Sequence, residues 1–320
     1  MTNRLFASTS ADVPPPPLAA RYSALILAGP TAVGKSSLAI EAAEALGAEI
    51  VGADAFQVYR GLDILTAKPT PDELQRVPHH LIGEVPLQTS FDVAQYLTLV
   101  ESHLADIRRR GRLPLIVGGT GLYIRALLRG LAPLPPTDLR LREELSTLPL
   151  PELQHRLTAL DPVAATQIDL ANPRRVIRAL EVCLASGRPF SSFREEWDAP
   201  VDRLYGVFLT RPRADLYARI DQRVDQMFAE GVIEEVAALR DHEFSPTSSQ
   251  TLGLSEIRQH LAGSLTRAEC IASIQKSTRH YAKRQLTWFK REQGLQTLEI
   301  GPVFSTAALF STLTAFTHIP

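Results

Sequence analysis

One stretch decides the fold of this chain: Gly29-Pro30-Thr31-Ala32-Val33-Gly34-Lys35-Ser36. It fits the pattern G-x-x-x-x-G-K-[ST], whose glycines let successive backbone N–H groups surround a phosphate. The apolar residues 24–28 predict a buried strand before it, and residues 37–46 predict a helix after it that ends at Gly47. A strand, a glycine loop and a helix N-terminus together favour an anion site. We therefore expect Lys35 to reach the outer phosphate and the Ser36 hydroxyl to hold Mg²⁺.

The bulk composition is that of an ordinary globular enzyme. The chain has 320 residues, of which 45% are apolar and 22% charged, and its formal net charge is −1. This balance gives no sign of nucleic-acid binding, so such a surface would have to come from local basic clusters. Two cysteines without C-x-x-C spacing argue against a disulfide scaffold or a zinc site. No apolar run is long enough to span a membrane, and we expect a cytoplasmic monomer without membrane contact.

Polar residues follow two further predicted strands. Residues 49–54 form one that ends in Asp54, and residues 113–117 form another that runs into a second glycine turn containing Thr120. Because the carboxyl ends of parallel strands meet at one edge of a sheet, both residues should lie beside the phosphate loop. Asp54 could hold Mg²⁺ through water or take a proton from a nucleophile, or it could be a capping or turn residue. Thr120 could offer its hydroxyl to a ligand or belong to a plain tight turn.

The composition of the sequence changes after residue 132. Residues 134–136 are typical of a linker, and three short helices follow, at 138–148, 151–160 and 172–186. The last has Asn172 as its N-cap, Pro173 at its first position and Gly187 as its stop. A strand at 205–210 then returns to core-like composition. We expect an all-helical domain at 135–201, inserted into an α/β core formed by 21–134 and 202–320, and a disordered extension at 1–20.

Two predicted helices near the C-terminus carry basic residues on one face. Arg219 and Arg223 are four positions apart in residues 214–228. A longer helix opens with the capping box Thr266-x-x-Glu269. Its basic side is a candidate for polyanion contact and consists of Lys276, Arg279, His280, Lys283, Arg284, Lys290 and Arg291. Its other side should pack on the core and consists of Cys270, Ile274, Tyr281, Trp288 and Phe289.

Six stretches, in this order, resemble those of bacterial tRNA dimethylallyltransferases, also called tRNA isopentenyltransferases. They are GPTAVGKS (29–36), DAFQVYR (54–60), TAKP (66–69), VGGTGLY (117–123), RRVIRALE (174–181) and TRHYAKRQLTWF (278–289). Each alone is weak to moderate evidence, whereas six in the right order are specific. The resemblance covers residues 25–291.

The resemblance implies a P-loop NTPase-like parallel sheet flanked by helices, with a helical insertion that grips tRNA. It implies transfer of a dimethylallyl group from dimethylallyl diphosphate to N6 of the adenosine 3′ of the anticodon, with Mg²⁺ as cofactor. Asp54 would be the base, with Lys35 and Thr120 also catalytic. The phosphate loop, with Arg219 and Arg223, would bind the diphosphate or a nucleotide such as ATP. The implied contacts to the tRNA anticodon stem-loop are Asp54, Ala55, Phe56, Gln57, Thr120, Arg142, Arg174, Arg175, Val176, Ile177, Arg178, Lys283 and Arg284.

The sequence departs from the usual pattern of this family in three places. Ala55 stands where the family usually has serine, which removes one hydroxyl contact. Gly83 stands where an aspartate is usual and is closer to the adenylate-type isopentenyltransferases of plants. Residues 250–255 differ from the usual Gly-Tyr-Lys/Arg, so the tRNA contact implied there is left open.

The chemistry of prenyl transfer needs the residues named above. A leaving diphosphate is stabilised by backbone N–H groups, a lysine and Mg²⁺, a carboxylate takes the proton of the attacking amine, and a stacked adenine must be flipped out. Three alternatives stay open: a small-molecule kinase, an adenylate isopentenyltransferase acting on free nucleotide, and an RNA-binding protein with a vestigial loop. The insertion disfavours the first two, and intact Lys35, Ser36 and Asp54 disfavour the third.

Overall fold

Short apolar strands alternate with helices along the chain, and the strands assemble into one parallel sheet. The computed structural model describes residues 16–197, 201, 203–301 and 304–317. The strand order is β3-β2-β4-β1-β5-β6, and each pairing is parallel. This confirms the expected parallel α/β sheet. The strands are β1 (Leu25–Ala28), β2 (Ala48–Ala53), β3 (His79–His80), β4 (Leu113–Gly118), β5 (Gly206–Thr210) and β6 (Leu295–Glu299).

Three neighbouring strands end in register at one edge of the sheet. Ala28 of β1 and Ala53 of β2 both lie opposite Gly118 of β4. A side chain has no room at Gly118, because a Cβ atom there would lie 2.1 Å from the carbonyl oxygen of Ala53. The chain leaves these strands as the phosphate loop, the Asp54 turn and the second glycine turn. The predicted meeting of these three segments is confirmed.

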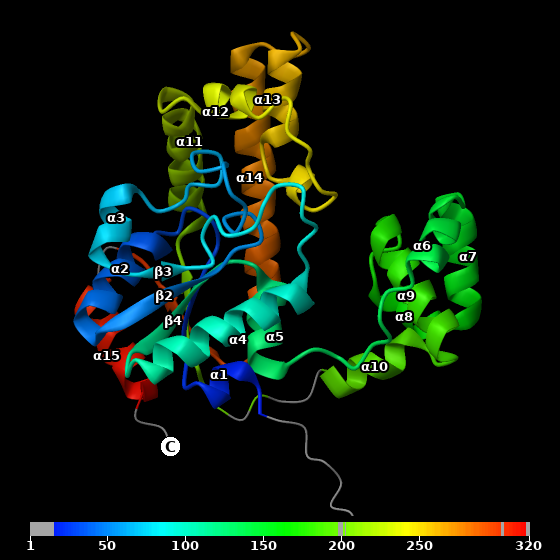
Figure 1. The fold of residues 1–320 in the computed structure, drawn as a ribbon, viewed down its shortest axis with the longest axis horizontal. Coiled ribbons are helices and arrows are strands. Elements are labelled where there is room, and N and C mark those ends of the chain that lie inside the picture. The colour runs from blue at the N-terminus through cyan, green and yellow to red at the C-terminus, as the bar shows by residue number, and fades with distance from the viewer. Residues whose placement is uncertain (1–15, 198–200, 202, 302–303, 318–320) are drawn as a thin grey trace, which may run out of the picture.

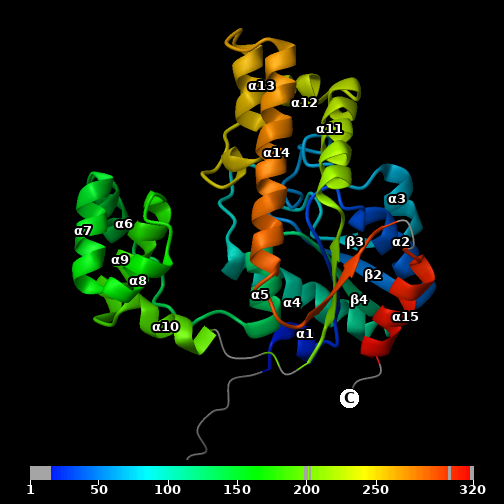
Figure 2. The same cartoon turned by 180° about the vertical axis from the view of Figure 1, so that it is seen from behind.

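Helices cover both faces of the sheet (Figures 1 and 2). Alternate residues of β1 point to opposite sides, so Ile26 and Ala28 belong to one hydrophobic cluster and Leu25 and Leu27 to another. The first cluster includes residues of α1 (Leu18–Arg21), α4 (Val93–Arg109) and α5 (Gly121–Arg129). The second includes residues of α2 (Lys35–Leu46) and α15 (Thr306–Thr317).

Four further helices stand together at one end of the sheet (Figure 1). They are α11 (Arg213–Ala229), α12 (Val232–Ala238), α13 (Leu254–Leu261) and α14 (Arg267–Phe289), with a 3₁₀ turn, η1 (Ser248–Gln250), before α13. The predicted capping box of α14 is present. The Thr266 hydroxyl accepts the Glu269 N–H at 3.2 Å, and the Glu269 carboxylate accepts the Thr266 N–H at 2.8 Å.

The expected helical insertion forms a bundle beside α5 and α14 in both views (Figures 1 and 2). Its helices are α6 (Leu139–Ser146), α7 (Leu150–Leu160), α8 (Pro162–Gln167), α9 (Pro173–Ser186) and α10 (Phe190–Trp197). Asn172 caps α9, Pro173 opens it and Gly187 ends it at a φ of 66°, as predicted. The bundle has a hydrophobic cluster of its own, in which Leu157, Val176 and Leu180 are fully buried. This separate core supports the proposed domain boundaries.

The expected disorder of residues 1–20 is corrected at its end. Residues 1–15 lie outside the described part of the chain. Residues from Leu18 onward form α1, and Leu18 and Ala19 are buried in the first cluster. The sequence patterns also did not predict β3, β6, α3 (Pro71–Arg76), α8, α10, α12, α13 and α15.

Candidate active site and nucleic-acid groove

The phosphate loop joins β1 to α2 and delivers Lys35 as the first residue of that helix. Gly34 just before it has a φ of 104°, a backbone conformation that favours glycine. The Lys35 ammonium donates to the Pro30 carbonyl at 2.8 Å, within its own loop. Burial lowers the pKa of Lys35 to about 8; the nearby Asp54 charge opposes this shift, and Arg223 adds to it. A partly buried cation that donates to a single carbonyl among the described residues is suited to receive an anion.

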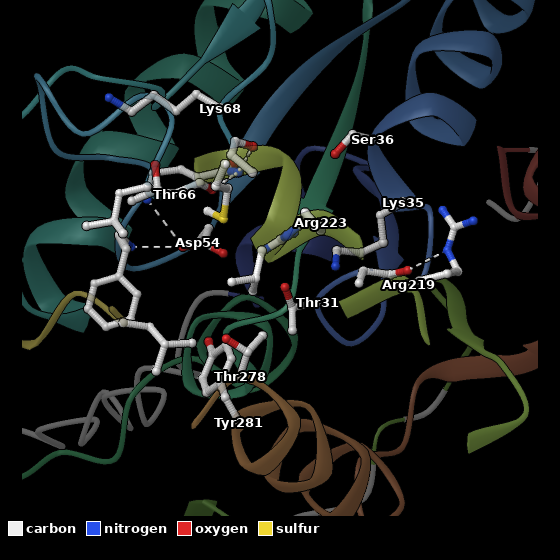
Figure 3. Close-up of a pocket in the computed structure, with 18 of the residues that line it drawn as sticks. Thr31, Lys35, Ser36, Asp54, Thr66, Lys68, Arg219, Arg223, Thr278 and Tyr281 are labelled. Carbon is white, nitrogen blue, oxygen red and sulfur yellow. Dashed lines mark hydrogen bonds between the residues drawn. The ribbon is translucent and has the colours of Figure 1, made fainter. Parts of the chain in front are cut away.

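Asp54 lies directly after β2 and uses its two carboxylate oxygens differently. Oδ1 accepts the N–H groups of Phe56 at 2.9 Å and Gln57 at 3.2 Å, so the aspartate does shape a turn. Oδ2 makes no hydrogen bond with any described residue. Asp54 lines a cavity of about 550 Å³ together with Lys35 and Arg223 (Figure 3). Both interpretations of this residue therefore stay compatible with the structure, because one oxygen serves the turn and the other is left for a substrate.

Three arginines surround the phosphate loop. Arg219 donates through Nε to the Ala32 carbonyl at 3.0 Å, and Arg211, which the sequence patterns did not single out, donates through Nε to the Val33 carbonyl at 3.3 Å. Arg223 lines the cavity with a buried Nε that has no partner among the described residues. Burial lowers the pKa of Arg223, and Asp54 opposes that shift. The two arginines predicted at this site are thus both beside the loop.

Thr120 lies next to the Asp54 turn rather than in the cavity wall. Its hydroxyl accepts the Ala55 N–H at 3.0 Å. Its side chain is also close enough to Tyr281 to influence the pKa of that residue. Tyr281 was expected to pack on the core but lines the cavity instead. Burial and the charge of Asp54 raise the pKa of Tyr281, and the nearby Thr120 side chain opposes that shift.

Residues 57–69 form an irregular loop over the cavity, and its shape is held by two side chains. Gln57 donates through Nε2 to the carbonyls of Thr66 at 3.0 Å and Ala67 at 2.8 Å. Its amide nitrogen is therefore engaged, and only its Oε1 is available to a nucleotide. The Glu235 carboxylate of α12 accepts three consecutive backbone N–H groups, those of residues 63 and 64 at 2.7 Å and of residue 65 at 2.9 Å.

The donor set for Mg²⁺ is small. The Ser36 hydroxyl is exposed in the cavity and makes no hydrogen bond with any described residue. The structure has no cluster of three or more His, Cys, Asp or Glu side chains placed to hold a metal within its described residues. Mg²⁺ commonly binds through one or two protein oxygens, with substrate phosphates and water completing its shell. The residues present therefore fit a Mg²⁺ ion that arrives with a diphosphate.

A second hollow, of about 890 Å³, lies between the core and the insertion. We call it the basic groove. It is lined by α5, α8, α9, α14 and the residues after α14, through Arg125, Arg129, Gln167, Arg175, His280, Lys283, Arg284, Thr287, Trp288, Arg291 and Gln293. Only part of the predicted basic side of α14 therefore lines this groove. Arg279 is an exception, because both oxygens of Asp221 on α11 accept from its Nη1, at 2.9 and 2.8 Å.

The arginines expected to contact tRNA from the insertion differ in their surroundings. Arg174 and Arg175 are exposed on α9. Arg178 donates to the Pro135 carbonyl at 2.9 Å, and Arg142 donates to the buried Glu181 carboxylate at 2.7 Å. These last two side chains thus join α9 to the linker and to α6. Val176, by contrast, is fully buried, and Ile177 is partly buried against the same cluster, so the expected contact of these two residues with tRNA stays a prediction.

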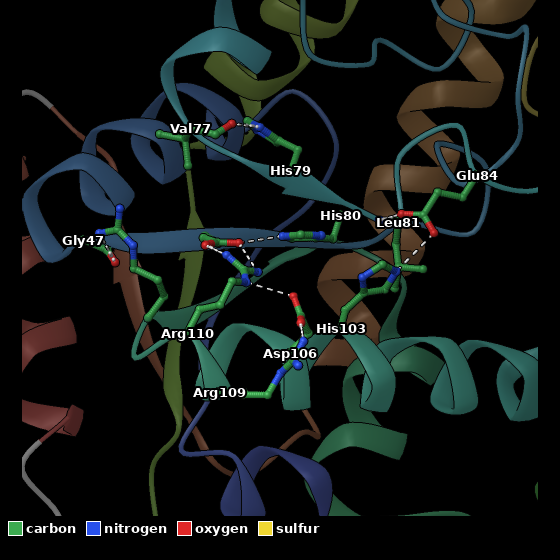
Figure 4. Close-up of polar contacts among 12 residues, drawn as sticks. Gly47, Val77, His79, His80, Leu81, Glu84, His103, Asp106, Arg109 and Arg110 are labelled. Atoms are coloured by element: carbon green, nitrogen blue, oxygen red, sulfur yellow. Dashed lines mark hydrogen bonds and ion pairs between the residues drawn. The ribbon is translucent and has the colours of Figure 1, made fainter.

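A second polar network lies along β2, outside the cavity lining (Figure 4). The carboxylate of Glu49, 3% exposed, accepts from Arg110 of the turn after α4 and from His80 at 2.8 Å. Burial alone would raise the pKa of Glu49, but these two bonds lower it overall. His79 bonds the Val77 carbonyl at 2.7 Å. Both histidines thus serve the fold.

No helix in the described part of the chain combines the length and apolar character needed to cross a bilayer.

Comparisons with known proteins find similarity over most of the chain. A family model described as IPP transferase matches residues 57–292. A tRNA dimethylallyltransferase of Geobacter metallireducens is 44% identical over 303 residues, covering 92% of this chain and 97% of its own. The solved full-length tRNA isopentenylpyrophosphate transferase of Bacillus halodurans is 36% identical with a TM-score of 0.66, covering 91% of this chain and 95% of its own. A eukaryotic dimethylallyltransferase, solved acting on tRNA, is 27% identical with a TM-score of 0.73, covering 86% of this chain and 73% of its own.

Proposed function

The chain belongs to the IPP transferase family, and from this premise we propose that it transfers a dimethylallyl group from dimethylallyl diphosphate to N6 of the adenosine 3′ of the anticodon in tRNA. The observation that carries this proposal is the shared cavity. A phosphate loop with a partly buried lysine and a carboxylate with one uncommitted oxygen line the same space. Such a cavity can bind a leaving diphosphate and receive a proton from an amine.

In the proposed reaction, the bond between the allylic carbon and the diphosphate oxygen breaks, and a bond from that carbon to adenine N6 forms. The N6 proton passes to Oδ2 of Asp54, while Oδ1 keeps the turn in place through its two backbone bonds. Lys35 and Arg223 stabilise the negative charge that builds on the diphosphate. Mg²⁺, held through Ser36 and the substrate phosphates, would supply further charge neutralisation.

The tRNA is proposed to lie in the basic groove, with its flipped adenosine entering the cavity. Backbone phosphates are the natural partners of clustered arginines and lysines, which fix position rather than read sequence. His280, Lys283 and Arg284 on α14 would contact one side of the anticodon stem-loop, and Arg174 and Arg175 on α9 the other. Ala55, Phe56 and the Oε1 of Gln57 would contact the flipped nucleotide. Because one chain supplies both cavity and groove, we propose that it acts as a monomer, in the cytoplasm where tRNA is modified.

The alternative functions do not account for the basic groove. A kinase or an adenylate isopentenyltransferase would use the cavity, but neither substrate needs a basic groove of about 890 Å³ beside it. The relatives compared above carry names that specify tRNA. These findings favour tRNA over a free nucleotide as the acceptor.

One labelling experiment separates the candidates. The protein is incubated with Mg²⁺, labelled dimethylallyl diphosphate, and either unmodified tRNA or free AMP, and a parallel reaction contains γ-labelled ATP. We expect label on tRNA alone, at the adenosine 3′ of the anticodon. Label on AMP would favour the adenylate enzyme, and transfer from ATP to a small molecule would favour a kinase. If no label appears on tRNA although a control shows that the labelled substrate is active, the proposal is wrong.

A further inference from the structure

One side of α14 makes a series of contacts with the two glycine turns of the active site. Tyr281 lies beside Thr120, as described above. Four residues later, the buried side chain of Gln285, 5% exposed, reaches between the turns. Three residues further, Trp288 lies against Gly121, where an added Cβ atom would be 2.3 Å from the indole ring. Positions i, i+4 and i+7 share one face of a helix, so α14 contacts this region over two of its turns.

Gln285 joins the two turns through both ends of its amide. Its Oε1 accepts the N–H of Thr31 in the phosphate loop at 2.9 Å. Its Nε2 donates to the carbonyl of Gly119 in the second glycine turn at 2.8 Å. The turns also touch directly, because the Gly29 N–H donates to the Gly118 carbonyl at 3.2 Å. Each hydrogen bond of the amide satisfies a backbone group of one turn, and a buried backbone group left without a partner is unfavourable.

The amide of Gln285 packs closely against the second glycine turn, and Gln285 also lines the cavity. A Cβ atom at Gly119 would lie 2.3 Å from Nε2 of Gln285 and 2.7 Å from the carbonyl oxygen of Gly29. A shift of the amide toward Gly119 would therefore displace the second glycine turn, and a rotation would break its hydrogen bonds to the two turns. The same helix presents His280, Lys283 and Arg284 to the basic groove.

We propose that Gln285 is a positioning residue for the prenyl transfer. The phosphate loop would hold the donor, and the second glycine turn, through Thr120 and the Ala55 N–H, supports the turn that carries Asp54. The amide of Gln285 sets the separation of these two segments, and hence the distance between the donor carbon and the amine held near the base. This inference rests on the proposed function and adds a residue to it. Reacting groups displaced by about 1 Å can lose about a hundredfold in rate.

The test compares Gln285→Met with Gln275→Met. The first replacement keeps the length of the side chain and removes both hydrogen bonds. The second makes the same change on the same helix, where the amide of Gln275 bonds α11 instead, at Asp225 Oδ1, 3.2 Å away. Turnover is measured with both substrates saturating, at a temperature well below the melting transition, and is divided by the folded fraction from near-ultraviolet circular dichroism. Donor and tRNA affinities are measured separately.

For Gln285→Met we expect kcat to fall by about tenfold to a hundredfold, with tRNA affinity within about twofold of the unmodified protein. Gln275→Met should keep its kcat. If Gln285→Met does not fold, Gln285→Glu replaces it, since the carboxylate keeps the Thr31 bond and loses the donor to Gly119; its kcat should also fall at least about tenfold. A kcat per folded molecule equal to that of Gln275→Met would show that Gln285 serves stability only. The proposed function fails separately, if the unmodified protein transfers no label to tRNA.

Discussion

At the scale of single residues, Asp54 shows how one side chain can satisfy a structural and a chemical demand together. Its Oδ1 closes the turn after β2, while its Oδ2 is uncommitted in the cavity. The sequence alone could not distinguish a turn aspartate from a catalytic base, since both occur directly after a strand. Because Oδ1 alone serves the turn, the proposed chemical role would use the other oxygen, and the two roles need not compete.

Asp54→Asn isolates the proposed chemical role. The asparagine oxygen can still accept the two backbone N–H groups, so the turn should survive, but a neutral amide cannot take a proton from adenine N6. We expect kcat to fall by about two to four orders of magnitude, with the melting temperature and tRNA affinity nearly unchanged. Single-turnover transfer with saturating substrates measures the loss. An asparagine variant that retains most of its activity would reduce Asp54 to a structural residue.

We expect the charge of Lys35 to lower the stability of the folded protein. Burial lowers its pKa from 10.5 to about 8, so between these values the unfolded chain binds more protons than the folded one, and stability from this group rises with pH. Below pH 8 the folded protein carries the full cost of the buried charge. At pH 7, Lys35→Met should therefore melt at a higher temperature than the unmodified protein, and it should lose prenyl-transfer activity. The gap between the two melting temperatures should narrow as pH rises toward 10. Calorimetry across this range measures the gap; a lower melting temperature at pH 7 would contradict the prediction.

At the scale of elements, the patterns that predicted this fold correctly are those with a local cause. The strand before the phosphate loop, the Asn172–Gly187 limits of α9 and the capping box of α14 each depend on residues adjacent in sequence. The elements that were not predicted depend on distant partners. β6 has mostly polar residues and is ordered by pairing with β5. Likewise, the two hydrogen bonds of Gln285 reach across 254 and 166 positions, and a pattern of neighbours cannot show them.

The link between α12 and the loop over the cavity can be tested at Glu235. Its carboxylate accepts the N–H groups of residues 63–65, and a glutamine there offers only one oxygen to the three donors. Glu235→Gln should destabilise the protein by about 1–3 kcal/mol and speed hydrogen exchange of these three amides. The neighbouring Glu234, which is exposed, provides the matched control Glu234→Gln, for which neither quantity should change. Equal exchange rates in the two variants would exclude this role of Glu235.

The basic side of α14 can be tested with paired charge reversals. Lys283→Glu with Arg284→Glu changes two groove residues, and Lys276→Glu with Lys290→Glu changes two exposed residues outside the groove. The first pair should raise the tRNA concentration needed for half-maximal rate and reduce the slope of log affinity against log salt by between about one and two. Melting temperatures should change little, because exposed charges contribute little to stability. If both pairs change the tRNA concentration and the salt slope equally, the result would favour a general effect of charge over specific binding in the groove.

At the scale of the whole molecule, the described residues form three hydrophobic clusters, two on the faces of the sheet and one inside the insertion. The cavity depends on the first two, because its walls come from the sheet edge, α11 and α14. The basic groove also needs α8 and α9 of the insertion. Donor binding and tRNA binding should therefore have different requirements for the integrity of the third cluster.

Leu157→Ala tests this division. Leu157 of α7 is fully buried in the third cluster, and its truncation should destabilise the insertion by about 2–5 kcal/mol. Because the sheet does not share this cluster, hydrogen exchange should quicken in α7 and α9 but not in β1 or β4, and binding of the diphosphate donor should be unchanged. Prenyl transfer to tRNA should fall through a weaker tRNA affinity, since one wall of the groove is then ordered for less of the time. Leu160→Ala is the matched control, because Leu160 lies on the same helix and is 45% exposed, so it should leave exchange and tRNA affinity as they were. Exchange that quickens equally in the sheet would mean that insertion and core unfold as one unit, and the proposed boundaries at 135 and 201 would then not separate two domains.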